Sequence, residues 1–145
     1  MFVRFRDPRQ PVPTRADPTV LVPYRNQHWV AVDTGFEIQI DDTAGPDGAD
    51  RHRTGAVYNI DLGAQLGQQT YTRPAALVPG QWNDYEIEVR GDTYRVRLGG
   101  ADTAVFTNTD GYRGKPVTAD PASGFLGLQA HTGRVAFRNI RIKEL

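Results

Sequence analysis

Residues 84–98 have the sequence DYEIEVRGDTYRVRL, in which apolar and polar side chains alternate on both sides of Gly91-Asp92. A period of two is typical of a β-strand with one buried face, and a two-residue Gly-Asp loop is typical of a hairpin turn. Such a loop pairs Arg90 with Thr93. The sequence therefore predicts an antiparallel hairpin with Glu88 opposite Arg95, Glu86 opposite Arg97, and an apolar face of Tyr85, Ile87, Val89, Tyr94, Val96 and Leu98.

The rest of the chain is also typical of an all-β protein. Fifteen glycines and ten prolines interrupt the sequence, and the glycine- and proline-free residues 134–145 alternate instead of showing helical spacing. We therefore predict a single β-sandwich domain over residues 1–145. The expected strands are 2–6, 27–33, 35–41, 55–60, 84–90, 93–98, 103–107, 124–131 and 134–143, with a bulge near Arg138-Asn139 and loops over 7–23, 41–54 and 107–123.

Residues 35–42, GFEIQIDD, combine a strand pattern with an unusual polar face. Alternation predicts that Phe36, Ile38 and Ile40 are buried. It leaves Glu37 and Gln39 on the open face, and carboxylates and amides there suit the binding of sugar hydroxyls and acid–base chemistry. An ordinary half-buried strand with acidic residues facing water explains the segment alone equally well.

Residues 124–131, GFLGLQAH, place Gly127, Gln129 and His131 on one face of a strand. Leu126, Leu128 and Ala130 take the other face. Glycine at 127 leaves room for a ligand or for a bulky neighbour. His131 is a candidate catalytic base, although a structural role is the common alternative for a single histidine.

Composition limits the functions that the chain can have. It has 17 basic and 17 acidic residues and no cysteine. Zero net charge argues against a nucleic-acid partner, and the lack of cysteine excludes disulfides and thiolate catalysis. No window is apolar enough for membrane insertion, the first residues do not have the pattern of a signal peptide, and no nucleotide-cofactor motif is present.

Two further features suggest ligand contacts. Asp41, Asp42, Asp47 and Asp50, with His52, crowd the loop 41–54, and their oxygen atoms could bind a divalent metal such as calcium, although the spacing differs from that of an EF-hand. Trp29 could stack on a sugar ring. Trp82, ahead of the hairpin, is expected to pack under the edge of the sheet.

In combination, five segments resemble the 3-keto-disaccharide hydrolase domain family: GFEIQIDD (35–42), RTGAVYNI (53–60), PGQWNDYEIEVRG (79–91), GFLGLQAHTG (124–133) and VAFRNIRIKEL (135–145). The resemblance implies a concanavalin A-like jelly roll with a concave carbohydrate-binding sheet. It also implies an extracellular or periplasmic protein that cleaves glycosidic bonds in 3-keto-glycosides. The residues it implies on or near the concave face are Glu37, Gln39, Tyr58, Gln129, His131 and, from the first strand, Arg4.

Within that resemblance we expect His131 to act as base or acid, with Glu37 as its partner, and Arg4 or Gln39 near the developing oxyanion. The family has further strands ahead of the segment that matches residues 2–6. We therefore expect a sandwich that lacks its N-terminal strands, with an open edge beside Phe2–Arg6 and a possible fusion to, or association with, a larger enzyme.

Two alternatives remain open from the sequence. The same face would serve a non-catalytic carbohydrate-binding or interaction module of a larger protein. A laminarinase-type glycosidase is the second alternative, because Glu37-Ile38-Gln39-Ile40-Asp41 resembles the acidic strand of those enzymes. Glu37 and Asp41 would, however, lie about 13 Å apart along a strand, whereas retaining glycosidases hold their carboxylates ~5–5.5 Å apart.

Overall fold

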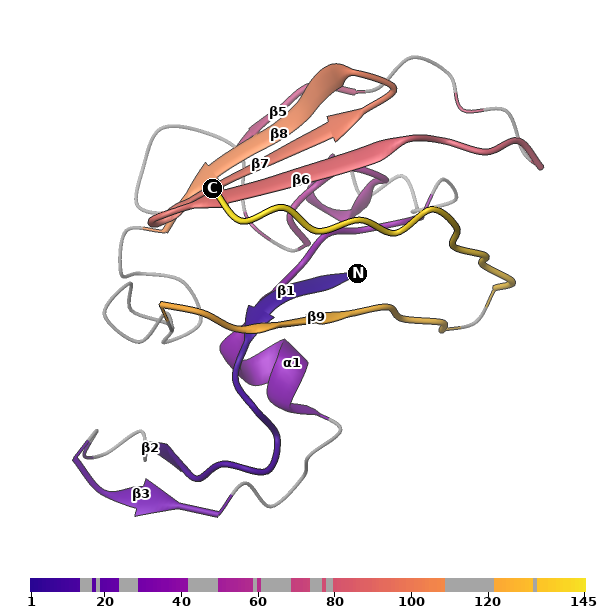
Figure 1. Ribbon diagram of the computed structural model, residues 1–145. Helices are drawn as coiled ribbons and strands as arrows, with labels where there is room; N and C mark the ends of the chain where they lie inside the picture. Colours follow the sequence, from indigo (N-terminus) through magenta and orange to yellow (C-terminus); the bar gives the residue numbers. More distant parts are fainter. Residues whose placement is uncertain are drawn as a thin grey trace.

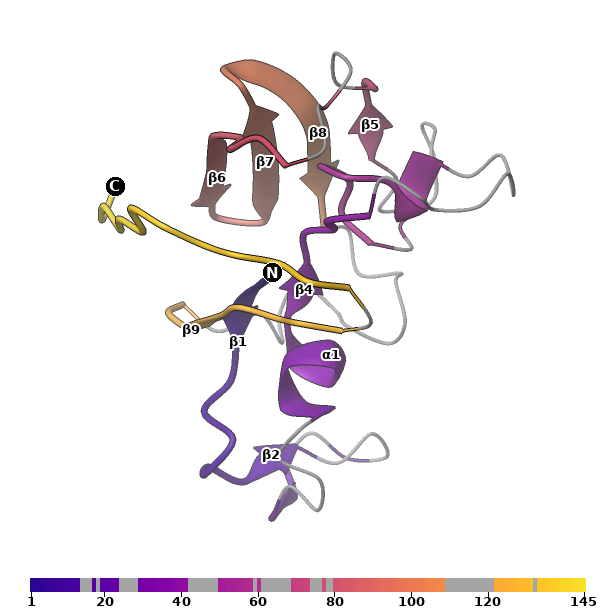
Figure 2. The same cartoon turned by 90° about the vertical axis from the view of Figure 1, so that its right-hand side faces the viewer.

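The computed structural model describes residues 1–13, 17, 19–23, 29–41, 50–58, 60, 69–73, 77, 80–108, 122–131 and 133–145. The regular secondary structure of this part of the chain is mainly β-strand, with two antiparallel sheets that pack against each other (Figures 1 and 2). A two-stranded ribbon of β2 (Val12–Pro13) and β3 (Leu21–Val22) lies within the predicted loop 7–23.

The larger sheet has the strand order β5-β8-β7-β6. Its strands are β5 (Thr70–Tyr71), β6 (Tyr85–Arg90), β7 (Thr93–Leu98) and β8 (Ala101–Thr107). The predicted hairpin is confirmed in register, since Glu88 lies opposite Arg95 and Glu86 opposite Arg97. Gly91 has a φ of 58°, a conformation that glycine adopts without a steric penalty, which explains the tight turn.

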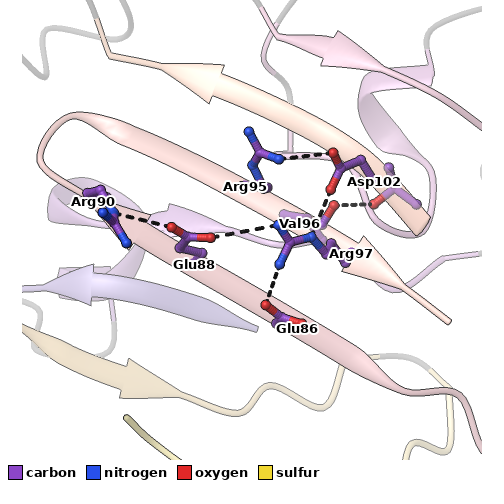
Figure 3. A network of polar contacts seen from close by, with 8 residues as sticks. Glu86, Glu88, Arg90, Arg95, Val96, Arg97 and Asp102 are labelled. Carbon is purple, nitrogen blue, oxygen red and sulfur yellow. Dashed lines mark hydrogen bonds and ion pairs between the residues drawn. The ribbon is translucent and has the colours of Figure 1, made fainter. Parts of the chain in front are cut away.

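Charged side chains cover the outer face of this hairpin (Figure 3). Arg97 bonds to Glu86 opposite it, at 2.5 Å, and to Asp102 of β8 at 3.0 Å. Arg95 pairs with Asp102 at 3.1 Å instead of with Glu88, because β8 is the neighbour of β7 on its other side. The face is thus a network around Arg97 in place of the separate cross-strand pairs that the hairpin alone would give.

The smaller sheet has the order β4-β1-β9, with β1 (Phe2–Phe5), β4 (Phe36–Glu37) and β9 (Phe125–Gly127). An antiparallel bridge between Ile38 and Val57 extends it beyond β4. The expectation of an open edge beside Phe2–Arg6 is wrong, because β1 is the middle strand of this sheet. Within the described residues, β9 is its outer strand on that side.

A core of apolar side chains joins the two sheets. Phe36 of β4 packs edge-on against Tyr94 of β7 and Phe106 of β8, with ring centroids 4.9 and 5.0 Å apart. Val3, Ile38, Val57, Ile60, Val96 and Ala104 complete this buried cluster. The protein is therefore an all-β sandwich, as the alternation in the sequence predicts.

Several predicted strands are shorter than expected or absent. Part of the predicted strand 27–33 forms the helix α1 (Val30–Thr34), and residues 27 and 28 lie outside the described residues. Among the described residues of the predicted strand 55–60, only Val57 makes a β-bridge. The predicted strand 134–143 runs in extended form between β9 and β6 (Figures 1 and 2) without forming a strand. The bulge expected there is absent, although Asn139 has a left-handed φ of 53° at the point where the apolar pattern changes parity.

Two burial predictions, for Ile40 and Trp82, are wrong. Ile40 is 40% exposed, because the described chain leaves the core after the pairing of residues 37–39 with residues 55–58. Leu126 and Leu128, on the apolar face of residues 124–131, are more than half exposed, and Ala130 is exposed as well. Trp82 is also more than half exposed and carries the Arg138 guanidinium over its ring, 4.0 Å from the centroid, instead of packing under the sheet.

Candidate functional site

Glu37 and Tyr58 lie opposite each other on neighbouring segments of the smaller sheet. The bridge between Ile38 and Val57 fixes this register, and the Tyr58 amide donates to the Glu37 carbonyl at 2.8 Å. Ile38 and Val57 are fully buried on the inner face, so alternation directs Glu37 and Tyr58 to the outer face. Both side chains are partly exposed. The arrangement places a carboxylate and a phenol side by side at a surface.

Gln39 continues the same row of the sheet. Its amide donates to the Ala56 carbonyl at 2.9 Å, and its own carbonyl accepts from the Gly55 amide and from the Tyr85 hydroxyl, at 3.1 and 2.9 Å. Tyr85 belongs to the larger sheet, so this bond ties the two layers together at the site. Gln39 is therefore fixed at the backbone while its side chain remains partly exposed.

Buried polar side chains hold the segment that carries Tyr58. The Gln69 amide nitrogen donates to the carbonyls of Val57 and Ile60, and its oxygen accepts from the Val57 amide at 2.9 Å. Thr54 accepts from the Asp41 amide through its hydroxyl, and its carbonyl accepts from the Tyr71 hydroxyl at 3.0 Å. Because these bonds are buried or partly buried, they fix the position of Tyr58 relative to Glu37.

His52 lies beside this pair, which the sequence did not indicate. It ends the short 3-10 turn η2 (Asp50–His52), and its imidazole packs against the Tyr58 ring with centroids 5.1 Å apart and planes tilted by 33°. The sequence suggested His52 only as a member of an acidic loop. Nothing in the spacing of 52 and 58 predicts this contact, because it depends on the turn at residues 53–56, where the Ala56 amide bonds to the Arg53 carbonyl.

The amino group of Met1 contributes to the electrostatics near Glu37. It donates to the Ile38 carbonyl at 2.8 Å, and the Ile38 amide donates back to the Met1 carbonyl. Burial lowers the pKa of this amine, while the nearby Glu37 carboxylate raises it in part. The carboxylate thus lies close enough to a cation to interact with it.

Gln129 and His131 follow the end of β9, a strand of the smaller sheet. Phe2 lies opposite both Glu37 and Gly127, so β4 and β9 flank β1, and Glu37 and Gly127 share a face. Glu37 and Gly127 are two strand spacings, about 10 Å, apart. His131 lies four residues beyond Gly127. The structure thus places Glu37 on β4 and His131 beyond the end of β9, the strand on the other side of β1. Gln129 is half-buried and His131 is exposed.

Gly127 accommodates a bulky neighbour. A Cβ atom there would lie 3.1 Å from the Phe5 ring, which also packs against the Phe125 ring at a centroid distance of 6.0 Å. Of the two explanations for this glycine, a ligand or a large side chain, the structure supports the second.

Arg4 and Trp29 are the two remaining site candidates from the sequence. The register between β1 and β9 shifts between Phe2 and Phe5, and Arg4 has a φ of 57° in this irregularity. Its guanidinium donates to the Gly91 carbonyl in the β6–β7 turn of the other sheet. Trp29 is exposed just ahead of α1. The Arg4 side chain thus bonds to the larger sheet, and Trp29 lies at the surface.

The sequence also suggests a calcium-binding loop at residues 41–54 and no membrane-spanning segment. Asp42 and Asp47 of the suggested calcium loop lie outside the described residues, so the structure does not test that loop as a whole. Among the residues that are described, no group of three or more histidine and acidic side chains is arranged to hold a metal ion. No helix in the described ranges is long and apolar enough to cross a membrane.

The fold and the polar row define a β-sandwich domain with a candidate ligand face on its smaller sheet. Residues 3–143, nearly the whole chain, match the family described as the 3-keto-alpha-glucoside-1,2-lyase-like domain. The chain belongs to this family, as the resemblance in its sequence indicates. No curated protein and no solved structure matched the chain in the same comparisons.

Proposed function

We propose that this protein binds 3-keto-glycosides on the face formed by Glu37, Gln39 and Tyr58 and cleaves their glycosidic bond by elimination. The observation that carries the proposal is the opposed pair of Glu37 and Tyr58, held on a rigid sheet in a chain of the 3-keto-glycoside lyase-like family. A carboxylate can remove a proton, and a phenol can donate a hydrogen bond to a developing oxyanion. Such a pair supplies two of the groups that the reaction needs.

The ketone at C3 makes the reaction possible at ordinary pH. It acidifies the proton on C2, which a base removes to form an enolate whose negative charge rests on the C3 oxygen. When that oxygen regains its double bond, a double bond forms between C1 and C2 and the C1–O bond breaks. The leaving alkoxide takes a proton from an acid, which yields an alcohol and an enone. Addition of water to the enone completes a net hydrolysis.

In this proposal Glu37 and His131 share the acid and base roles. Glu37 belongs to β4 and His131 follows β9, the strand on the other side of β1, so they would act across a bound sugar. Gln39 and Gln129 would bind hydroxyl groups through their amides. Trp29 would serve as a stacking surface at the periphery, and Arg4 would reach the oxyanion only if it left the Gly91 carbonyl.

A carbohydrate-binding module without turnover is the second candidate. The observation in its favour is the exposure of His131 together with its position beyond the end of β9, the strand on the other side of β1 from Glu37. A laminarinase-type glycosidase is less well supported. Asp41 lies beyond the end of β4, so the acidic strand that such enzymes carry is not formed over residues 37–41.

Incubation with a 3-keto-disaccharide in D₂O tests the proposal. We expect release of the alcohol product, a transient enone absorbance, and deuterium at C2 of recovered substrate if proton removal is reversible. The unoxidised disaccharide is the matched control and should not react, because it lacks the ketone that acidifies C2. Binding without product favours the module, and cleavage of the unoxidised sugar favours the ordinary glycosidase.

The substitution Glu37→Gln separates binding from chemistry. It keeps the size and hydrogen-bonding capacity of the side chain but removes the base. We expect the variant to bind substrate with similar affinity and to lose turnover by about 10²–10⁴-fold. Turnover at the wild-type rate would rule out Glu37 as the base.

A further inference from the structure

The contact between His52 and Tyr58 is not used by the proposed function. The two aromatic rings lie 5.1 Å apart with their planes tilted by 33°, and both residues are partly exposed. Tyr58 is also the residue opposite Glu37. His52 therefore contacts the phenol of the site without belonging to the polar row itself.

The backbone between the two rings is held from several directions. Gly55 has a φ of 85°, and a Cβ atom there would lie 2.6 Å from the Thr103 hydroxyl oxygen, so only glycine fits at this position. Thr103 in turn donates its hydroxyl to the Gly55 carbonyl at 3.1 Å. Thr54 is buried, and the Gly55 amide bonds to the Gln39 carbonyl. The turn that connects His52 to Tyr58 is thus fixed to both sheets.

A partly exposed tyrosine on a sheet surface would otherwise exchange between rotamers. An aromatic neighbour that packs against its ring disfavours the alternative rotamers and fixes the direction of the hydroxyl. Catalytic groups that are displaced by about 1 Å can lose about 10²-fold in rate, so the orientation of Tyr58 matters to the reaction proposed above.

We propose that His52 is a positioning residue of the site, whose ring holds the Tyr58 phenol beside Glu37 so that the two groups act on one sugar ring. This inference rests on the proposed function for its effect on turnover. The positioning itself is a property of the free protein and can be measured without substrate.

Two substitutions distinguish the effect of the His52 aromatic ring from the effect of its nitrogen atoms. His52→Phe keeps an aromatic ring against Tyr58, whereas His52→Ala removes it. We expect His52→Ala to lower kcat by about 10- to 100-fold with a smaller change in KM, and His52→Phe to restore kcat to within about threefold of wild type. Trp82→Ala, which removes an exposed ring outside the site, is the matched control and should leave kcat unchanged.

Nuclear magnetic resonance of the Tyr58 ring supplies the second readout. In wild type and His52→Phe we expect one set of Tyr58 ring signals, with contacts to residue 52. In His52→Ala we expect the Tyr58 ring signals to shift, because the side chain then averages over several rotamers. Wild-type kcat or unchanged Tyr58 signals in His52→Ala would overturn the proposal, and so would a His52→Phe variant as slow as His52→Ala. If wild type cleaves no 3-keto-glycoside, the proposed function fails, and the ring signals alone decide whether His52 positions Tyr58.

Discussion

Phe36 of the smaller sheet and Tyr94 of the larger sheet pack edge-on with ring centroids 4.9 Å apart, and this contact joins the two layers of the sandwich. Ile38, two residues further along, belongs to the same buried cluster. The polar residue between them, Glu37, is carried on the opposite face. The stability of the core and the orientation of the site therefore depend on the same short segment.

Replacement of Ile38 with alanine tests this dependence. Ile38 is fully buried, so we expect the free energy of unfolding to fall by about 2–5 kcal/mol in denaturant melts. Ile40→Ala is the matched control in the same segment. Because Ile40 is 40% exposed, Ile40→Ala should lower the free energy of unfolding clearly less than Ile38→Ala does. Equal losses for the two variants would contradict the observed change from core to surface between residues 38 and 40.

Gly124 allows β9 to approach the irregular part of β1. A Cβ atom at 124 would lie 2.8 Å from the Arg4 carbonyl carbon and 2.9 Å from the Phe5 carbonyl oxygen. Backbone atoms cannot move aside as a flexible side chain does, so we expect Gly124→Ala to destabilise the fold by about 1–3 kcal/mol in thermal or denaturant unfolding. Gly133→Ala, where a Cβ would meet nothing within 4 Å, should be nearly neutral.

Asp7 is expected to titrate well below an ordinary aspartate. Hydrogen bonds from the Arg9 side chain, at 2.7 and 2.9 Å, and from the Arg9 amide lower its pKa from 3.8 to about 2. Because the folded pKa is depressed, the stability that this turn contributes is present above pH 3.8 and is lost as the pH falls through about 2. Carboxyl chemical shifts measured against pH should report this value.

The substitution Arg9→Met should raise the pKa of Asp7 toward 3.8. Asp17, whose pKa is lowered by hydrogen bonds from Thr19, should not change in that variant. An unchanged pKa of Asp7 after loss of the Arg9 guanidinium would contradict the assigned cause.

The outer strand β9 and the residue that follows it expose apolar side chains. Phe125 is 45%, Leu126 54% and Leu128 52% exposed. Exposed apolar edge strands promote association between chains. We expect Leu126→Lys combined with Leu128→Lys to reduce self-association in light scattering. A control pair with the same charge change, Gln81→Lys and Asn83→Lys on the exposed residues ahead of β6, should have less effect. A wild-type protein that remains monomeric at high concentration would contradict this prediction.

His131→Ala tests the proposed role of the histidine that follows β9. If His131 supplies the acid or the base, the variant should still bind a 3-keto-disaccharide but lose turnover by about 10²–10⁴-fold. Arg134→Ala, on a neighbouring exposed residue, is the control and should retain turnover. Unchanged turnover in His131→Ala would leave Glu37 and its neighbours as the source of both proton transfers.

The sequence alone determined the parts of the fold that depend on local periodicity. The alternation across Gly91-Asp92 predicted the register of β6 and β7, because a two-residue turn and a buried face leave no other pairing. The pattern of residues 36–38 likewise predicted which side chains are buried. The combination of segments also identified the family, since together they are far more specific than any one of them.

Only the tertiary structure decided where these elements meet. It made β9 an outer strand, so the exposure of Leu126 and Leu128 could not follow from alternation alone. It turned Arg4 toward Gly91 through an irregularity in β1, and it brought the ring of His52 against Tyr58. These relationships join residues through turns and neighbouring strands, and a periodic pattern carries information about faces but not about which neighbour occupies them.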